Sequence, residues 1–481
     1  MNISNIASSN FNKTKIIATI GPACQSKTML AGLIDSGVSI VRLNFSHGTH
    51  AQHQQVIDTV RELNQVQGRH IALLQDLQGP KLRVGEVAGD VVKLTQGAKL
   101  TITTEPLVGT AEKVSTTYQD LAKDVQIGDK LLVDDGKIIL KAVEKTNTDL
   151  ITEVLHGGWL RSRKGINLPF TQLSSSSLTK KDQEDLQFGL QNDVEWIALS
   201  FVREVQDVVD LKAKIAAAGK TARVVAKIEK PEALDNIDAI IQEADAVMVA
   251  RGDLGVEIAM ERVPLEQKRI VSKCNQAGKP VIIATQMMES MIESPTPTRA
   301  ETNDIANAVI DGADAVMLSA ETAVGKYPRE VIRQMKKTVL IAEKHPAVYN
   351  RYQDIATHSS TFYNENVVQT ACRLSQEIKA KAIVCMTQSG WVAFELAKHR
   401  PQAAIFFFTA NRSLLNTINL IWGARGYYYD KMVSTDDTFA DIEHLLTQTQ
   451  YLKKGDVFIS MASMPIEARL HTNMLKVNIV A

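Results

Sequence analysis

Short apolar runs recur along the chain and alternate with segments whose apolar residues repeat at helical spacing. Eight of these runs are rich in β-branched residues and end at turn or charge signals: Lys15–Ile20, Ser39–Asn44, His70–Asp76, Glu195–Phe201, Arg223–Ile228, Ala246–Arg251, Pro280–Thr285 and Ala315–Ser319. Continuous apolar runs are typical of strands that are covered on both faces, as parallel βα units produce. Eight such units predict an α/β fold, a (β/α)8 TIM barrel.

The alternation of strands and helices is interrupted once. Between about Gln78 and Phe170 the chain is rich in Thr, Val, Gly and Asp and has little helical periodicity. This stretch predicts a small all-β domain inserted after the third barrel strand. Pro80 and Pro169 lie at its two ends, where hinges would let the insert close over the barrel as a lid.

A second α/β alternation begins at about Glu365, with apolar runs at Ala382–Met386, Ala404–Phe408 and Asp456–Met461. It predicts a further domain with a short, mainly parallel sheet. We therefore expect three domains: a barrel formed by residues 1–77 and 171–355, a lid formed by residues 78–170, and a C-terminal α/β domain formed by residues 356–481.

Composition limits the classes of partner. The 481 residues include 54 Lys+Arg and 54 Asp+Glu, so the formal net charge is zero. This balance argues against binding to nucleic acid or membranes, but it leaves room for a small anion in a local basic pocket. The chain has neither a secretion signal nor an apolar run long enough to span a membrane, and its four cysteines form no CxxC pair. We expect a cytoplasmic protein with buried thiols.

Polar residues follow most of the predicted barrel strands. The carboxyl ends of parallel barrel strands meet on one face, which carries the active site in barrel enzymes. We call this face the barrel mouth. The residues expected there are Arg42–Asn44, Gln75–Asp76, Lys227–Glu229, Arg251–Asp253, Thr285–Gln286 and Ser319–Glu321.

Two carboxylates at the barrel mouth predict a divalent cation. Glu229 and Asp253 follow the fifth and sixth strands, which are neighbours, and oxygen ligands suit Mg2+. Lys227 lies two residues before Glu229 and would spread the charge of a phosphoryl group in transfer. A purely structural Lys–Glu pair is the alternative.

Backbone and cationic groups nearby suit an anionic substrate. The turn around Gly252 would open a short helix with free N–H groups for a carboxylate or phosphate. Arg42 and Arg83 offer donors for phosphate oxygens, and Lys81, Lys164 and Arg251 add positive charge. Together these residues predict a small, multiply anionic substrate.

Six segments of the chain resemble the pyruvate kinase family: RLNFSHG (42–48), QDLQGPKLR (75–83), KIEKPE (227–232), MVARGDLGVEI (248–258), ATQMMESMIESPTPTRAE (284–301) and DAVMLSAETAVGKYP (314–328). The resemblance extends over nearly the whole chain. It implies an Mg2+-dependent phosphotransferase of glycolysis, with Mn2+ as a substitute metal, that moves the phosphoryl group of phosphoenolpyruvate to ADP and yields pyruvate and ATP. It also implies a homotetramer.

The resemblance also assigns residues. Arg42, Lys227 and Thr285 would be catalytic, and Arg42, Gly252, Asp253, Thr285, Ser319 and Glu321 would bind the substrate. Glu229 and Asp253 would ligate Mg2+. Asn44, His47, Arg83 and Lys164 would bind the nucleotide. In the C-terminal domain, Thr387, Gln388, Ser389 and Gly390 resemble a loop that binds the phosphate of an allosteric effector, although a simple helix cap explains the same residues.

The monovalent cation site departs from the family pattern. Members that need K+ are similar to this chain at Asn44, Ser46 and Asp76, but carry Thr at the position of Leu77 and Glu at the position of Lys81. Leu77 offers no side-chain oxygen, and Lys81 brings a fixed ammonium group. We expect Lys81 to replace K+, so that the enzyme works without it.

Two other functional classes compete with an active kinase. A barrel lyase or aldolase would also use Mg2+ and a keto acid, but it would not need a nucleotide clamp such as Arg83 and Lys164. A catalytically silent regulatory homologue is the other alternative, and the intact catalytic positions argue against it.

Overall fold

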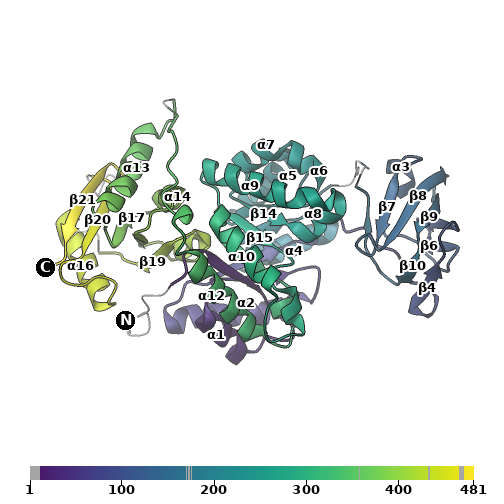
Figure 1. Cartoon of the computed structure of the whole chain (residues 1–481), viewed down its shortest axis with the longest axis horizontal. Helices are drawn as coiled ribbons and strands as arrows, with labels where there is room; N and C mark the ends of the chain where they lie inside the picture. The colour runs from purple at the N-terminus through teal and green to yellow at the C-terminus, as the bar shows by residue number, and fades with distance from the viewer. Residues whose placement is uncertain are drawn as a thin grey trace.

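Eight parallel strands close into a barrel at the centre of the molecule, as predicted (Figure 1). The structure is a computed structural model and describes residues 11–169, 171, 174, 176–356, 358–431, 434–464 and 471–481. Around the barrel the strands run in the order β1 (Lys15–Thr19), β16 (Ala315–Leu318), β15 (Val281–Ala284), β14 (Ala246–Ala250), β13 (Arg223–Ile228), β12 (Trp196–Leu199), β3 (Ala72–Asp76) and β2 (Ile40–Asn44).

Alternate residues of these strands point into the barrel or toward the surrounding helices. Ile17, Leu74, Trp196 and Met248 belong to the inner cluster, which is fully buried. Their neighbours pack against the helices in a larger outer cluster. Because side chains fill the barrel, chemistry is confined to its ends.

The helices of the barrel surround the sheet on its outer face. They are α1 (Lys27–Ser36), α2 (His50–Gln67), α4 (Lys180–Gln191), α5 (Val205–Ala217), α6 (Pro231–Asp235), α7 (Ile237–Glu243), α8 (Arg251–Glu257), α9 (Val263–Ala277), α10 (Arg299–Asp311), α11 (Ala320–Ala323) and α12 (Pro328–Ala342). The sequence marks their ends clearly in places. Thr298 and Glu301 form a capping box at the start of α10, and Gly312 ends it with φ 111°.

The insert after β3 is a β domain that Figure 1 shows beyond one end of the barrel, joined to it by two connections. Its larger sheet has the order β11 (Ile166–Asn167), β7 (Lys130–Val133), β8 (Ile138–Lys145), β9 (Asp149–His156), β5 (Lys99–Thr103) and β6 (Lys113–Ser115). A second sheet pairs β10 (Gly158–Arg161) with β4 (Val91–Leu94), and α3 (Leu121–Asp124) is a single helical turn. The insert has its own apolar core, which includes Leu100, Leu131, Leu140 and Leu150.

The C-terminal part is a five-stranded α/β domain. Its sheet has the order β19 (Ala424–Tyr428), β18 (Ala404–Thr409), β17 (Ala382–Met386), β20 (Val457–Ala462) and β21 (Met474–Ile479), and only β21 is antiparallel. Its helices are α13 (Phe362–Glu377), α14 (Trp391–Lys398), α15 (Arg412–Thr417) and α16 (Thr435–Gln448). The sequence analysis did not predict β19 or β21.

This domain covers the amino ends of the barrel strands. Lys15 Nζ at the start of β1 donates to Ala424 O at 2.8 Å, and Arg400 Nη2 lies 2.9 Å from Asp314 Oδ2 just before β16. The carboxyl ends of the strands therefore remain for the barrel mouth. Cys24, Cys274, Cys372 and Cys385 are free, buried thiols, as expected. In the part of the chain that the structure describes, no helix has the length and apolarity to cross a membrane.

Candidate active site

A buried carboxylate joins two cations at the barrel mouth. Asp76 Oδ2 accepts from Arg42 Nε at 2.7 Å, and Asp76 Oδ1 lies 3.1 Å from Lys227 Nζ. Arg42 also donates to Thr19 Oγ1 at 2.8 Å. Burial raises the pKa of Asp76, but the charges of Lys227 and Arg42 outweigh it and the net pKa is lowered. Three strands thus hold a fixed ion network in which both cations have set directions.

Lys227 is the most heavily bonded group of this network. Its Nζ lies 2.9 Å from Glu229 Oε1 and donates to Ser200 Oγ at 2.7 Å. Burial lowers the pKa of Lys227, but the carboxylates of Asp76, Glu229 and Asp253 outweigh it, so the net pKa is raised. The ammonium group is therefore charged throughout the physiological pH range, as a group that stabilises phosphoryl charge must be.

Glu229 and Asp253 fit a divalent cation. Glu229 is 1% exposed, and its Oε2 accepts from the amide of Phe201 at 2.8 Å. Burial raises the pKa of Glu229, the charge of Lys227 lowers it, and the nearby Asp253 carboxylate raises it again, with a net increase. A cation between the two carboxylates would remove this repulsion. Among the described residues no three His, Cys, Asp or Glu side chains cluster as metal ligands, so substrate and water oxygens would complete the shell.

Thr285 lies beside Gly252 in a strained turn after β15. Its Oγ1 accepts from the Gly252 amide at 2.7 Å and donates to Ala284 O at 2.6 Å. Thr285 and Gln286 both have positive φ, 66° and 53°, which costs on the order of 1–3 kcal/mol for a residue other than glycine. The Gly252 amide that the resemblance assigns to the substrate carboxylate is therefore bonded to the Thr285 hydroxyl here.

Ser319 and Glu321 lie just after β16 and are joined by a hydrogen bond. Glu321 Oε2 accepts from the Ser319 amide at 2.7 Å, and its Oε1 accepts from the Met288 amide at 3.2 Å. Burial raises the pKa of Glu321. The carboxylate thus ties the β16 end to the loop that follows β15.

Arg251 does not add a free cation to the barrel mouth, contrary to our expectation. It is 9% exposed, and both terminal nitrogens of its guanidinium donate to protein acceptors. The sequence analysis counted its charge, but the charge count carries no information about which way the side chain points.

The segment after β2 meets the hinge of the lid. Asn44 Oδ1 accepts from the Ser46 amide at 3.1 Å, and the carbonyl of His47 lies 3.0 Å from His53 Nε2. Burial lowers the pKa of His47, and the charges of Arg83, Lys81 and Arg42 lower it further. Cations from the hinge and from the barrel thus act on the same imidazole.

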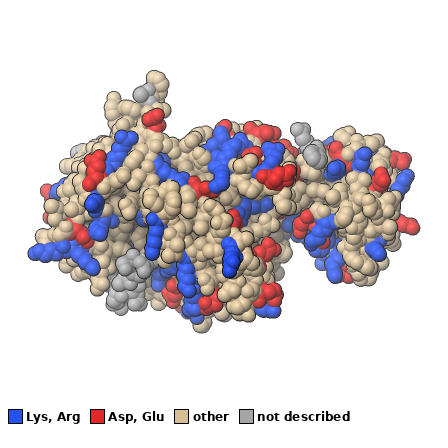
Figure 2. All heavy atoms as spheres, viewed as in Figure 1, with Lys and Arg blue, Asp and Glu red and all other residues tan. Residues whose placement is uncertain are grey.

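A cavity of about 180 Å³ lies between the hinge, the lid and the barrel mouth. Lys81, Arg83 and Lys164 line it together with Asp253. Lys164 Nζ lies 2.8 Å from Asp134 Oδ1 within the lid, and Arg83 Nη1 donates to Arg163 O at 3.0 Å. The predicted nucleotide cations therefore surround one space that reaches the predicted metal ligand. Elsewhere on the face in Figure 2, basic and acidic side chains are interspersed, consistent with zero net charge.

Hydroxyl groups of the predicted effector loop are bonded to the amides of Gly390, the N-cap of α14, and of Trp391, its first residue. Thr387 Oγ1 accepts from the Gly390 amide at 2.9 Å, and Ser389 Oγ accepts from the Trp391 amide at 3.4 Å. The Trp391 ring packs edge-on against His471, with ring centroids 5.4 Å apart. Two amides that would bind a phosphate are thus bonded within the loop that also contains Gln388.

Sequence reasoning missed Ser200, which accepts from Lys227 and donates to Leu77 O at 2.7 Å. Its signal was present, because Ser200 is a polar residue near the end of the fourth predicted strand. It also missed Glu257, which lies 2.9 Å from Lys230 Nζ and accepts from Asn167 Nδ2 at 2.9 Å. Glu257 and Lys230 lie in the segments 248–258 and 227–232 that carry the resemblance, but Asn167 of the lid lies in none of these segments, so this contact was not predicted.

Comparisons with known proteins agree with this geometry. The family model of the pyruvate kinase barrel domain matches residues 11–332, and that of the pyruvate kinase alpha/beta domain matches residues 365–478. The pyruvate kinase of Corynebacterium glutamicum is 41% identical over 468 residues, which cover 97% of this chain and 98% of that protein. The pyruvate kinase of Geobacillus stearothermophilus is 39% identical over 472 residues, covering 98% and 80% respectively.

A crystal structure of a pyruvate kinase from Cryptosporidium parvum superposes with a TM-score of 0.91 at 33% identity, covering 100% of this chain and 99% of that one. Sequence and fold therefore agree over all three parts of the molecule. The chain belongs to the pyruvate kinase family, whose members are phosphotransferases.

Proposed function

We propose that the barrel mouth performs the pyruvate kinase reaction with Arg42, Lys227 and Thr285 as its catalytic residues. In that reaction the bond between phosphorus and the enol oxygen of phosphoenolpyruvate breaks, and a bond forms between phosphorus and a terminal oxygen of ADP. The observation that carries the proposal is the placement of Lys227 between Asp76 and Glu229, at 3.1 and 2.9 Å. The proposed barrel domain comprises residues 1–77 and 171–355, the lid 78–170 and the C-terminal domain 356–481.

Arg42 and Lys227 act on the phosphoryl group. Arg42 binds its oxygens in the ground state, and Lys227 neutralises the charge that spreads over them during transfer. Asp76 fixes both cations before substrate arrives, so little reorganisation is needed. When bound at Glu229 and Asp253, Mg2+, or Mn2+ in its place, would supply positive charge to the phosphoryl oxygens and orient them.

The enolate that remains after transfer takes a proton at its methylene carbon and becomes pyruvate. Thr285 lies on the proton path to that carbon. The amides of Gly252 and Asp253 receive the substrate carboxylate, with Ser319 and Glu321 as further substrate contacts. The Thr285 hydroxyl gives up its 2.7 Å contact with the Gly252 amide when the carboxylate binds, and it then lies next to the bound substrate.

The nucleotide binds between the barrel and the lid. Asn44 and His47 from the barrel, and Arg83 and Lys164 from the hinge and the lid, contact its phosphates. The proposal is supported by the cavity that Arg83 and Lys164 line and by the charge of Arg83 at His47. A lyase would have no use for this set of cations.

Lys81 takes the place of K+ at the site formed by Asn44, Ser46, Asp76 and Leu77. The oxygens of Asp76 are engaged by Arg42 and Lys227, and Leu77 is 1% exposed with no side-chain oxygen. Lys81 acts on His47, whose amide donates to Asn44 O at 3.1 Å. The support for Lys81 is this charge at His47, the residue after Ser46.

We expect ATP formation from phosphoenolpyruvate and ADP with Mg2+ in Tris buffer free of sodium and potassium, with less than a twofold rise on adding KCl. The double variant Leu77→Thr/Lys81→Glu should become K+-dependent by about tenfold or more, because reversing a charge near bound anions changes their energy by a few kcal/mol. Leu77→Thr alone is the control and should stay independent of K+. A many-fold stimulation of the unmodified enzyme by KCl would refute the role of Lys81, and no ATP under either condition would refute the kinase activity itself.

Two exposed apolar surfaces support a homotetramer. Met260, in the turn before α9, and Leu265, in the first turn of α9, are 75% and 69% exposed. Val477 and Ile479 lie on β21, the edge strand of the C-terminal sheet, and are 45% and 67% exposed. Edge strands with exposed apolar residues are prone to pair with another chain. In the proposed tetramer each chain uses the surface of Met260 and Leu265 for one interface and the β21 edge for a second. Together these two interfaces join four chains.

Light scattering should give a mass about four times the 52.9 kDa of the chain. Ile479→Lys should shift it to a dimer, because an edge lysine opposes pairing of two strands. Val108→Lys, at a lid residue that is 63% exposed, is the matched control and should remain a tetramer. A monomer of unmodified enzyme at micromolar concentration would contradict the proposal.

For the C-terminal loop, binding of a phosphorylated effector by Thr387, Gln388, Ser389 and Gly390 requires the phosphate to displace the Thr387 and Ser389 hydroxyls from the amides of Gly390 and Trp391. A cytoplasmic location without nucleic-acid or membrane partners accords with the free, buried thiols.

A further inference from the structure

Arg251 is the first residue of α8, and its guanidinium is turned into the protein. Nη2 donates to Thr285 O at 2.7 Å and to Gln286 O at 3.2 Å, and it lies 2.9 Å from Met287 Sδ. Nη1 donates to Asp304 Oδ1 at 2.8 Å and to Gln267 Oε1 at 3.3 Å. Its Nε is buried without a hydrogen-bond partner, and both terminal nitrogens are bonded to protein acceptors.

The turn that Arg251 holds is unfavourable by itself. Thr285 and Gln286 are consecutive left-handed residues, and neither is glycine. Thr is β-branched, for which this conformation is unusual. The carbonyl oxygens of Thr285 and Gln286 both accept from Arg251 Nη2. The positive charge of the guanidinium offsets the repulsion between the two carbonyl groups. The cation therefore stabilises a backbone conformation that the sequence of the turn does not favour.

The segment 251–252 makes a second contact with Thr285, through the backbone of Gly252. The amide of Gly252, the residue after Arg251, donates to Thr285 Oγ1 at 2.7 Å, while the Arg251 side chain binds Thr285 O. A Cβ at Gly252 would lie 3.3 Å from Thr285 Oγ1, so the hydroxyl approaches the backbone closely. Residues 251 and 252 thus both contact Thr285, and the contact from Arg251 to Thr285 O does not use the amide that the substrate carboxylate takes.

The far side of the guanidinium is anchored as well. Asp304 on α10 and the buried Gln267 on α9 bind Nη1, so the plane of the guanidinium is fixed by two helices. A planar fork that binds on two edges is a property of Arg that Lys does not share.

We propose that Arg251 is a positioning residue for protonation of the enolate: it holds the left-handed turn that places the Thr285 hydroxyl at the carbon to be protonated. The inference rests on the proposed role of Thr285. In the reverse direction a C–H bond of the pyruvate methyl group breaks, its proton leaves through Thr285, and its electrons enter the enolate. Each reversal in D2O places one deuterium in the methyl group, and this exchange reports proton transfer separately from phosphoryl transfer.

The test measures deuterium uptake into the pyruvate methyl group by proton NMR, with Mg2+ and ATP, for Arg251→Lys and Arg251→Met. We expect uptake to fall about 10- to 100-fold, as for a misplacement of about 1 Å, with the KM for phosphoenolpyruvate changed less than threefold. Arg333→Met, at an exposed arginine of α12 paired with Glu330, is the control and should exchange at the unmodified rate.

Two further variants separate the inference from the function on which it rests. If Thr285→Val leaves uptake unchanged, the proton role of Thr285 is wrong and the inference falls with it. If Thr285→Val lowers uptake but Arg251→Lys does not, the inference alone is wrong. The double variant Arg251→Met/Thr285→Val should exchange no more slowly than Thr285→Val. Arg251→Lys keeps the charge, so it decides the question if the methionine variant does not fold. A rise in the KM for phosphoenolpyruvate as large as the loss of uptake would assign Arg251 to substrate binding and overturn the inference.

Discussion

Replacement of Lys227 by methionine is expected to lower the kcat of ATP formation by about 10³- to 10⁵-fold, the effect of removing a cation from a phosphoryl group in transfer. Methionine keeps much of the side-chain length but removes the charge that lies 3.1 Å from Asp76 and 2.9 Å from Glu229. The enzyme would then present carboxylates, without their cation, to an anionic transition state. A coupled assay at saturating phosphoenolpyruvate, ADP and Mg2+ measures the loss.

The expected pattern is a large fall in kcat and a small change in KM. Arg42 stays paired with Asp76 through its own Nε, so the ground-state contact to the phosphoryl group remains. We expect the KM for phosphoenolpyruvate to rise less than tenfold, the signature of an interaction made in the transition state. Lys212→Met is the control, because Lys212 pairs with Glu243 and Asp245 on the outer helices. A fall in kcat below tenfold would exclude Lys227 from the transfer step.

The sequence predicts the barrel well because its strands are covered on both faces. Each of the eight apolar runs contains one observed strand, and the observed ends lie within two residues of the predicted ones. The same criterion fails at sheet edges. β21 carries alternating apolar and polar residues and is largely exposed, and β19 contains Arg425. A continuous apolar run indicates a buried segment rather than a strand as such. Strands that are partly exposed lack this signal and were therefore not predicted.

Positions in the site were predictable to the extent that the ends of strands define them. Register places Asn44 opposite Asp76, so the polar ends of β2 and β3 meet at one level. The direction of a side chain was not predictable in this way. Lys227 lies near the end of β13 and Arg251 directly follows β14, yet Arg251 binds backbone carbonyls and Lys227 faces carboxylates. Only packing against α9 and α10 separates the two roles.

Removing the charge of either carboxylate at the barrel mouth is the second change for which we expect a large effect, in this case on the Mg2+ requirement. Glu229→Gln and Asp253→Asn should each raise the Mg2+ concentration for half-maximal activity by about 100-fold or more, since loss of an outer-shell partner alone costs roughly 10- to 100-fold. Both substitutions keep the side-chain volume and remove one charge. Titration of activity with MgCl2 after removal of metal by a chelator measures the shift.

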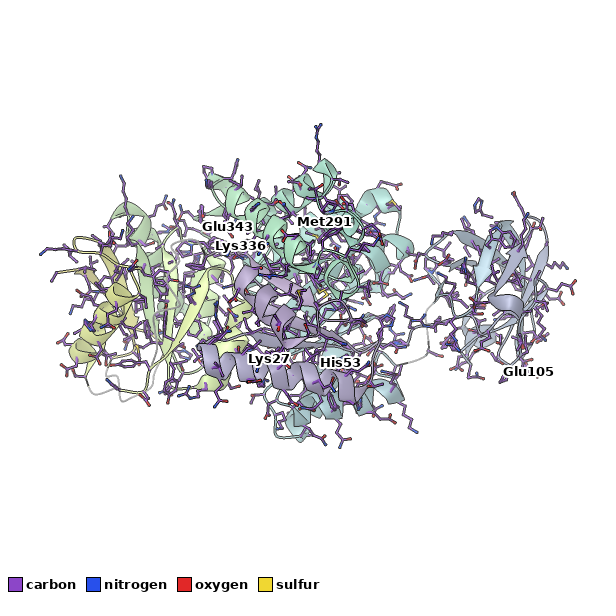
Figure 3. The ribbon with its side chains drawn as sticks, turned by 90° about the horizontal axis from the view of Figure 1, so that it is seen from below. Lys27, His53, Glu105, Met291, Lys336 and Glu343 are labelled. Atoms are coloured by element: carbon purple, nitrogen blue, oxygen red, sulfur yellow. The ribbon has the colours of Figure 1, made fainter. Side chains whose placement is uncertain are left out.

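The shape of the titration separates a metal ligand from a structural partner of Lys227. A glutamine at position 229 still offers an acceptor to Lys227 Nζ or to the Phe201 amide, so a purely structural role predicts lower activity with the same Mg2+ midpoint. Glu343→Gln is the matched control: Glu343 is 6% exposed, accepts from the Thr14 amide at 2.6 Å, and directly follows α12, away from the lid (Figure 3). It should lower thermal stability without moving the midpoint. If the Mg2+ midpoint is unchanged in both Glu229→Gln and Asp253→Asn, other residues bind the metal and Glu229 serves only as the counter-ion of Lys227.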